Sequence, residues 1–278
     1  MRAPAWRATA LALVVACLAG AIAAAAGIVA PTTSVAPAGR AYLLTRDGKL
    51  LQALNADAPL PPASLTKLLT ALVVLDARWD PNAWLRVSAT AAAAEPSRLD
   101  LRIGDEIKAG DALVGMLVHS ANDACLLLVE HAAASQAEFL RLMNQRARAL
   151  GMQASHFGSP CGFDAADQYA SANDLLRLGL QAWDHPLIRY IATLREATIR
   201  TRAGRNLHFL TTNALLGRLD GVLGLKTGYT ARAGECLIAV AERDGHRVWL
   251  VMLGADDRWW SAHRLIDAAL AGPSEPPR

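Results

Sequence analysis

The chain places its strand-like segments at its two ends and its helix-like segments between them. Residues 41–54 read as two short strands around Asp47-Gly48, a pair typical of a tight hairpin turn. Residues 220–230 and 234–254 also favour strands, and Asp244-Gly245 predicts the turn of the last pair. We therefore predict an α/β protein of the α+β type, in which the first and last segments form one antiparallel sheet.

The middle of the chain predicts helices that pack on this sheet and form an inserted helical lobe. Residues 59–79 are apolar nearly all round, which is typical of a buried helix, and residues 111–120 and 124–134 continue in the same way. Ser135 and Glu138 form a capping box before the next helix, which Gly151 is placed to end. A further helix runs to about Trp183, and residues 257–272 predict a closing helix.

Size and charge exclude some classes of function. The 278 residues, 53% hydrophobic and 19% charged, suffice for one domain with a sizeable core and a small lobe. The formal net charge is only +3, and the basic residues form no run along the chain. We therefore expect no nucleic-acid partner.

The first residues are typical of an export signal. Arg2 and Arg7 precede an uncharged stretch, and Ala24 and Ala26 offer a small-residue cleavage site, so residues 1–26 are expected to be a signal peptide. The stretch is also long enough to span a bilayer, which makes an uncleaved membrane anchor the alternative. Either way the protein is expected outside the cytoplasm, in the periplasm or on the outer face of the cytoplasmic membrane.

Four cysteines lie at positions 17, 125, 161 and 236. Removal of the leader would leave three, which cannot all pair with one another, and none has metal-ligand spacing with a histidine. Three buried or partly buried thiols are favoured over a zinc site. One disulfide among Cys125, Cys161 and Cys236 stays open as the alternative for an exported protein.

Ser64 and Lys67 lie three residues apart, on one face of the predicted buried helix. Unpaired backbone N–H groups at the helix start would stabilise a serine alkoxide and disfavour a protonated lysine. Burial would also lower the lysine pKa, toward an amine able to accept a proton. This pattern indicates a nucleophile with its base, although Ser-x-x-Lys alone also fits a serine cap beside an exposed lysine.

Lys226-Thr227-Gly228 ends a predicted apolar strand. A cation and a hydroxyl there suit an anionic group such as a carboxylate. Gly228 has no side chain to obstruct a ligand that lies along the strand. Taken alone, the same three residues could also be a strand that ends in a polar turn.

The tetrapeptide Ser-Ala-Asn-Asp occurs twice, at residues 120–123 and 171–174. The first copy separates two apolar helices, where a break brings polar side chains into the core. The second copy precedes an amphipathic run, and Ser171 with Asp174 has the spacing of an N-terminal capping pair. We predict a catalytic element in the first copy, with Ser120 and Asn122, and a structural cap in the second.

In this order, Ser-x-x-Lys, Ser-x-Asn and Lys-Thr-Gly resemble the motif triad of the penicillin-recognising serine enzymes. The surrounding sequence is similar to the low-molecular-mass D-alanyl-D-alanine carboxypeptidases, from about Ala41 to Leu270. The segments that carry the resemblance are residues 41–76, 102–131, 139–152 and 224–245. It implies the serine β-lactamase/DD-peptidase-like fold, with a linker at 27–38, a catalytic domain at 39–270 and a tail at 271–278.

The resemblance also implies a role for each matching residue. Ser64 would attack a D-alanyl-D-alanine bond of a peptidoglycan stem peptide, with Lys67 as base and Ser120 as proton relay. Asn122 would hold the substrate amide and Thr227 its terminal carboxylate. Lys226 would support the proton network, and the N–H groups of Ser64 and Tyr229 would form the oxyanion hole. No metal or organic cofactor is implied, and β-lactam antibiotics would trap Ser64.

Three other functions share parts of this pattern. A D,D-endopeptidase that cuts peptide cross-links often has the catalytic domain alone, whereas many carboxypeptidases carry a further β-rich domain and an amphipathic tail. A sensor that binds β-lactams without turnover could keep the fold. A class A β-lactamase needs a Glu-x-x-Leu-Asn loop, which we do not find. Arg258, after the last strand, could add charge for the carboxylate or lie on the surface.

Overall fold

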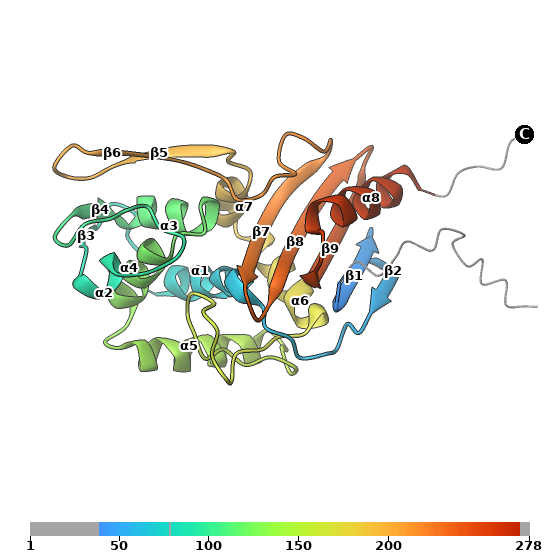
Figure 1. Cartoon of the computed structure of the whole chain (residues 1–278), viewed down its shortest axis with the longest axis horizontal. Helices are drawn as coiled ribbons and strands as arrows, with labels where there is room; N and C mark the ends of the chain where they lie inside the picture. Colours follow the sequence, from blue (N-terminus) through green and yellow to red (C-terminus); the bar gives the residue numbers. More distant parts are fainter. Residues whose placement is uncertain (1–38, 78, 273–278) are drawn as a thin grey trace, which may run out of the picture. The chain divides into compact units, whose positions relative to one another are not determined.

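The computed structural model describes residues 39–77 and 79–272, so the expected signal peptide and the linker at 27–38 lie outside the described part. The expected antiparallel sheet is present and has five strands in the order β2-β1-β9-β8-β7 (Figure 1). Its first and last segments meet where Leu43 of β1 pairs with Val251 of β9. The strands are β1 (Ala41–Arg46), β2 (Lys49–Leu54), β7 (Val222–Thr230), β8 (Gly234–Arg243) and β9 (His246–Ala255).

Helices cover both faces of the sheet. The alternation of side chains along β8 directs Ile238 and Val240 to one face and Leu237 and Ala239 to the other, and all four are fully buried. The first face packs against α1 (Lys67–Asp76) and α6 (Ala172–Asp184), and the second packs against α8 (Arg258–Ala271) (Figure 1). Because both faces are buried, β8 is apolar along most of its length rather than alternating with polar residues.

The helical lobe lies beside the sheet, between β2 and β7 in the sequence (Figure 1). A 3₁₀ turn at Ala63–Thr66 leads into α1, whose eight buried residues make it the central helix of the lobe. Two small two-stranded sheets, β3-β4 and β5-β6, flank the lobe. The elements of this region are α1 (Lys67–Asp76), β3 (Trp84–Arg86), α2 (Ala89–Ala92), β4 (Glu106–Lys108), α3 (Ala109–Val118), α4 (Asn122–Ala132), α5 (Gln136–Ala149), α6 (Ala172–Asp184), α7 (Pro186–Ala192), β5 (Glu196–Arg200) and β6 (Asn206–Leu210).

Local sequence signals account for most element ends. The Ser135 hydroxyl accepts a 3.1 Å hydrogen bond from the Glu138 N–H at the start of α5, as the capping box predicts. Gly151 has a φ of +73° just past the end of that helix, which confirms it as the terminating residue. The helix predicted to run to about Trp183 is α6, which ends at Asp184, and Pro186 begins the next helix, α7, where its missing N–H costs nothing. The β5–β6 hairpin was not predicted.

Across the described ranges 39–77 and 79–272, no helix combines the length and the apolar character that crossing a bilayer requires.

Candidate active site

Ser64 and Lys67 meet at the junction between the 3₁₀ turn and α1. Lys67 Nζ lies 2.9 Å from Ser64 Oγ, so the three-residue spacing places them together as predicted. The lysine side chain is fully buried. Burial lowers the pKa of Lys67 well below its usual range, and the charge of nearby Lys226 lowers it further.

Two oxygen atoms fix the position of the Lys67 amine. Its Nζ donates to Asn122 Oδ1 at 2.7 Å and to the backbone carbonyl of Cys161 at 2.6 Å. The amide nitrogen of Asn122 in turn donates to the Glu95 carbonyl at 3.0 Å. The first tetrapeptide therefore contacts the Ser64–Lys67 pair directly, as the sequence predicted.

A disulfide joins Cys125 of α4 to Cys161, which corrects the expectation of three free thiols. Both residues are buried, and they lie 36 positions apart in the sequence, so their proximity depends on how the lobe folds. Cys236 is a free, fully buried thiol on β8, and burial raises its pKa to about 11. The disulfide therefore links Cys161, whose carbonyl accepts from Lys67, to α4.

Ser120 lies between α3 and α4, and its backbone has a φ of +60°, which non-glycine residues seldom adopt. In this conformation its hydroxyl accepts a 2.9 Å hydrogen bond from Lys226 Nζ. Lys226 is buried on β7 and also donates to the Thr227 carbonyl at 2.9 Å. Burial lowers the pKa of Lys226 to about 7, and the charge of Arg258 contributes to the shift.

The rest of the Lys-Thr-Gly segment lines the same site. A side chain at Gly228 would meet the backbone nitrogen of Ser64 at 3.0 Å, so glycine lets β7 approach the nucleophile segment. Thr227 Oγ1 lies 2.6 Å from Thr212 Oγ1, which restrains its hydroxyl. The Tyr229 side chain, by contrast, is 66% exposed and lies away from this cluster's buried groups.

Arg258 is buried, so the alternative that it is a surface arginine is wrong. Its side chain is buried and donates to the carbonyls of Gly228, at 2.8 Å, and Cys236, at 2.9 Å. It also lies 3.7 Å from the carboxylate of Glu235. Arg258 therefore supports β7 from behind and adds positive charge near Lys226.

The second tetrapeptide is a helix cap, as predicted. The Ser171 hydroxyl accepts from the Asp174 N–H at 3.1 Å, and Ser171 is fully buried at the start of α6. The Asp174 carboxylate accepts from Ala154 N and Ser155 Oγ, both at 2.8 Å. None of these contacts involves Ser64 or either buried lysine.

Sequence reasoning missed three contributors to the site. Gly162 has a φ of +85°, and a side chain there would collide with the backbone of Ala63 beside the nucleophile. The Cys161 carbonyl could not be found because every residue has one. Thr212 follows a hairpin that no pattern predicted. Only Gly162 left a signal, since glycine is the residue that permits a positive φ and a close approach of two backbone segments.

The fold is that of the DD-peptidases. The Streptomyces K15 DD-transpeptidase crystal structure is similar, with a TM-score of 0.80 and 25% sequence identity, over 86% of this chain and 99% of that one. The sequence family described as D-alanyl-D-alanine carboxypeptidase (Peptidase_S11) matches residues 31–257. The chain therefore belongs to the D-alanyl-D-alanine carboxypeptidase family.

Two curated relatives illustrate the range of names in this family. The chain is 32% identical over 220 residues to "D-alanyl-D-alanine carboxypeptidase DacF" of Bacillus subtilis, over 77% of this chain and 57% of that relative. It is 33% identical over 215 residues to a "D-alanyl-D-alanine endopeptidase" of Pseudomonas aeruginosa, over 75% of this chain and 68% of that relative. The chain thus spans little more than half the length of the first and about two thirds of the second.

Proposed function

We propose that this chain is a serine-type D-alanyl-D-alanine carboxypeptidase that acts on peptidoglycan stem peptides through an acyl-enzyme and is inhibited by β-lactams. In this proposal Ser64 is the nucleophile, Lys67 its base and Ser120 the proton relay to the leaving amine. Asn122 orients the substrate amide, and Lys226 and Thr227 receive the substrate carboxylate. No metal or organic cofactor takes part in these steps.

The observation that carries the proposal is the set of contacts around Lys67. A neutral amine has two N–H bonds and one lone pair. Asn122 Oδ1 and the Cys161 carbonyl can only accept, at 2.7 and 2.6 Å, so they take both N–H bonds. The lone pair is then left for the hydroxyl of Ser64, 2.9 Å away. Because burial lowers the Lys67 pKa, this amine is available as a base.

The chemical steps balance with these groups. Ser64 Oγ bonds to the carbonyl carbon of the penultimate D-alanine while its proton passes to Lys67. The C–N bond then breaks, and the leaving amine takes a proton through Ser120. Water attacks the ester next, releases the shortened peptide and returns a proton to Ser64. The N–H groups of Ser64 and Tyr229 would stabilise the negative oxygen in both steps.

Lys226 and Thr227 supply the features that a terminal carboxylate needs. Burial and, to a smaller degree, the charge of Arg258 lower the pKa of Lys226 to about 7, so Lys226 carries its charge below neutral pH, while Arg258 supplies positive charge from behind the strand. The Thr227 hydroxyl is restrained by Thr212 at 2.6 Å, so it is oriented before a substrate binds. Gly228 lets β7 pack closely against the segment that carries Ser64, which corrects the expectation that it leaves space for a ligand and brings Lys226 and Thr227 close to the nucleophile.

The same residues support trapping by β-lactams. A β-lactam carries an amide carbonyl and a carboxylate like those of the dipeptide, so Ser64 would open its ring and form a stable ester. Fast hydrolysis of that ester would need a second base, and the sequence lacks the Glu-x-x-Leu-Asn loop of class A β-lactamases. We therefore propose a penicillin-sensitive peptidase rather than a β-lactamase or a non-catalytic β-lactam sensor.

The proposed site of action is outside the cytoplasmic membrane. A cell-wall substrate requires export, and residues 1–26 have the pattern of a signal peptide or an uncleaved anchor. N-terminal sequencing of the mature protein, together with fractionation, distinguishes these two cases. An intact Met1 in a carbonate-resistant membrane fraction would establish the anchor.

A labelling and product experiment tests the proposal. Fluorescent penicillin should label the wild type and a Ser135→Ala control, which loses only a surface helix cap, but not Ser64→Ala. A pentapeptide monomer should then lose one free D-alanine, detected by mass spectrometry. Labelling that survives in folded Ser64→Ala refutes the nucleophile, and labelling without any turnover supports the sensor instead.

An endopeptidase is the second candidate, and its reaction uses the same residues on a cross-linked dimer. The 33% identity to a relative named D-alanyl-D-alanine endopeptidase, over 75% of this chain, favours it. Offering the pentapeptide monomer and the cross-linked dimer at equal concentration separates the two activities. Conversion of dimer to monomers without release of D-alanine from the monomer would establish the endopeptidase.

A further inference from the structure

Asp123, the last residue of the first tetrapeptide, is a fully buried carboxylate in the first turn of α4. Its two oxygens accept from the N–H of Leu99 at 2.9 and 3.1 Å, and one of them accepts from the N–H of Leu101 at 3.2 Å. The N–H of Ala124 donates to the same carboxylate at 2.8 Å. A carboxylate is costly to bury, and here backbone N–H groups from a distant segment offset that cost.

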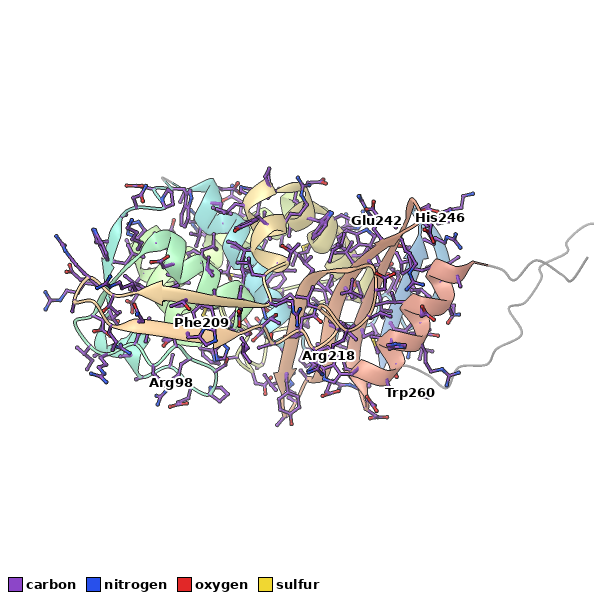
Figure 2. All side chains as sticks on the ribbon, turned by 90° about the horizontal axis from the view of Figure 1, so that it is seen from above. Arg98, Phe209, Arg218, Glu242, His246 and Trp260 are labelled. Carbon is purple, nitrogen blue, oxygen red and sulfur yellow. A yellow bond between two sulfur atoms is a disulfide. The ribbon has the colours of Figure 1, made fainter. Side chains whose placement is uncertain are left out.

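Residues 95–101 are the segment that carries these N–H groups, and they lie against the first tetrapeptide. The Ser97 carbonyl accepts from the Asn122 N–H at 2.7 Å, and the Ser97 hydroxyl donates to the His119 carbonyl at 2.9 Å. Arg98 of this segment is exposed and lies at the edge of the helical lobe (Figure 2). The segment is thus attached to the residue just before the tetrapeptide and to two residues within it.

The Glu95 carbonyl, at the start of this segment, fixes the orientation of the Asn122 amide. A carbonyl can only accept, so it must face Nδ2, which donates to it at 3.0 Å. The other end of the amide, Oδ1, then faces Lys67 Nζ at 2.7 Å. If the amide turned over, Nδ2 would face Lys67 and would donate to the lone pair that Ser64 needs.

We propose that Asp123 is a positioning residue for acylation, which holds residues 95–101 so that the Glu95 carbonyl keeps the Asn122 amide in this orientation. The inference rests on the proposed function and extends it to a carboxylate whose hydrogen bonds reach neither the nucleophile nor its base. Without this carboxylate, the segment keeps its attachments through Ser97 but loses those beyond it. The Glu95 carbonyl would then face the amide for a smaller fraction of the time.

The second tetrapeptide provides a matched control. Asp174 occupies the same place in it, is 5% exposed, and accepts from Ala154 N and Ser155 Oγ, both at 2.8 Å. It therefore also fastens a distant segment, but its contacts involve neither the nucleophile nor either buried lysine. Asp123→Asn and Asp174→Asn each replace one carboxylate oxygen with an NH₂ group, which cannot accept from the donor that it faces.

Stopped-flow acylation by a fluorescent penicillin measures the effect, together with the melting temperatures of the same variants. Asp123→Asn should slow acylation about tenfold, because a small misplacement of a group that orients the base suffices for such a loss. Asp174→Asn should keep the wild-type rate, even though its melting temperature should also fall. A wild-type rate in folded Asp123→Asn, or equal losses in the two variants, overturns the proposal.

A double-mutant cycle separates positioning from loss of structure. In an Asn122→Ala protein there is no amide to orient, so adding Asp123→Asn should slow acylation by less than about twofold further. A merely structural role would multiply the two losses instead, and that result also overturns the proposal.

A second variant serves if Asp123→Asn does not fold. Ser97→Ala removes only the hydroxyl that donates to the His119 carbonyl, so it should slow acylation about threefold, and only while Asn122 is present. An unchanged rate, or the same loss in the Asn122→Ala protein, counts against positioning by this segment. Failure of the proposed function gives a different result, because wild type would then form no penicillin ester at Ser64, and the role of Asp123 would fall with it.

Discussion

The two Ser-Ala-Asn-Asp tetrapeptides have the same sequence and different surroundings. Ser120 has a left-handed backbone, with φ of +60°, and its hydroxyl accepts from the buried Lys226. Ser171 is extended, with φ of −88°, and its hydroxyl accepts from the N–H of Asp174 three residues later. The same hydroxyl therefore contacts a buried lysine of the candidate active site in one copy and caps a helix in the other.

The asparagines differ in the same way. Asn122 donates to Glu95 and accepts from Lys67, whereas the exposed side-chain contact of Asn173 is a 2.6 Å hydrogen bond to Asp57. The first copy joins two buried helices and faces β7, while the second opens α6 after a loop. The comparison shows that burial and backbone conformation, rather than the tetrapeptide sequence itself, determine the role of each copy.

The largest difference is expected between Ser120→Ala and Ser171→Ala in acylation. Without its hydroxyl, position 120 cannot pass a proton to the leaving amine, so acylation by penicillin should slow by about 10²–10⁴-fold. Ser171→Ala should leave the rate nearly unchanged, because its hydroxyl touches no reacting group. Stopped-flow acylation of both folded variants checks this, and equal rates would refute the distinction.

The asparagine pair gives the next effect. Asn122→Ala leaves one N–H of the buried Lys67 without its acceptor, so we expect acylation to slow by about ten- to a hundredfold. Asn173→Ala removes an exposed contact to Asp57 and should change the rate little. Rates measured on both variants decide the point. A comparable loss in Asn173→Ala would show that the second copy also shapes the site.

Of the two tetrapeptides, only the first contacts Lys226. The lowered pKa of Lys226 can be tested through the pH dependence of the free energy of unfolding. The pKa is about 7 in the folded protein and about 10.4 in an unfolded chain. Between these values the unfolded chain binds more protons, so the free energy of unfolding should rise with pH, by about 1.4 kcal/mol per pH unit. The gain is absent below pH 7, where lysine is protonated in both states.

Lys226→Met should reduce this slope, and Lys49→Met, an exposed residue on β2, should retain it. Part of the slope will persist in Lys226→Met because Lys67 is also buried with a lowered pKa. Urea unfolding at pH 7, 8 and 9 measures the three slopes. An identical slope in Lys226→Met and wild type would mean that Lys226 stays protonated in the folded protein.

The smallest expected effect is the cap of α6. Ser171→Ala should lower the free energy of unfolding by about 1 kcal/mol, the usual contribution of a helix cap. Ser120→Gly should come close to wild-type stability, because glycine relieves the left-handed backbone while the hydrogen bond to Lys226 is lost. Thermal melts of the two variants test this ordering, and a larger loss at position 120 would reverse it.

The predictable part of the site is the part that local spacing encodes. Ser64 and Lys67 follow from one helical turn, and Ser120 and Asn122 follow from a break between apolar helices. Lys226 follows from a predicted apolar strand, although β7 does not end at Lys-Thr-Gly but continues to Thr230. The hairpin at β1–β2 and the caps of α5 and α6 follow from turn and capping residues. Each of these signals lies within about four residues, where backbone geometry fixes which side chains meet.

The remainder depends on contacts between distant segments. The Cys125–Cys161 pairing and the carbonyl that accepts from Lys67 arise only when a loop folds onto α4. Arg258 could be buried because two backbone carbonyls from separate strands accept from it, and no spacing encodes that. The β5–β6 hairpin has one buried residue on each strand, Ile199 and Phe209, so its hydrophobic pattern was too weak to detect.

Because of the disulfide, the position of Lys67 depends on whether Cys125 and Cys161 have been oxidised. Until Cys125 and Cys161 are oxidised, no covalent link fastens the Cys161 carbonyl over Lys67, and the lysine can lose an acceptor that directs its lone pair to Ser64. Oxidation belongs to compartments outside the reducing cytoplasm. Protein prepared with a thiol reductant would lack this link, so it should be a poor guide to the activity of the oxidised enzyme.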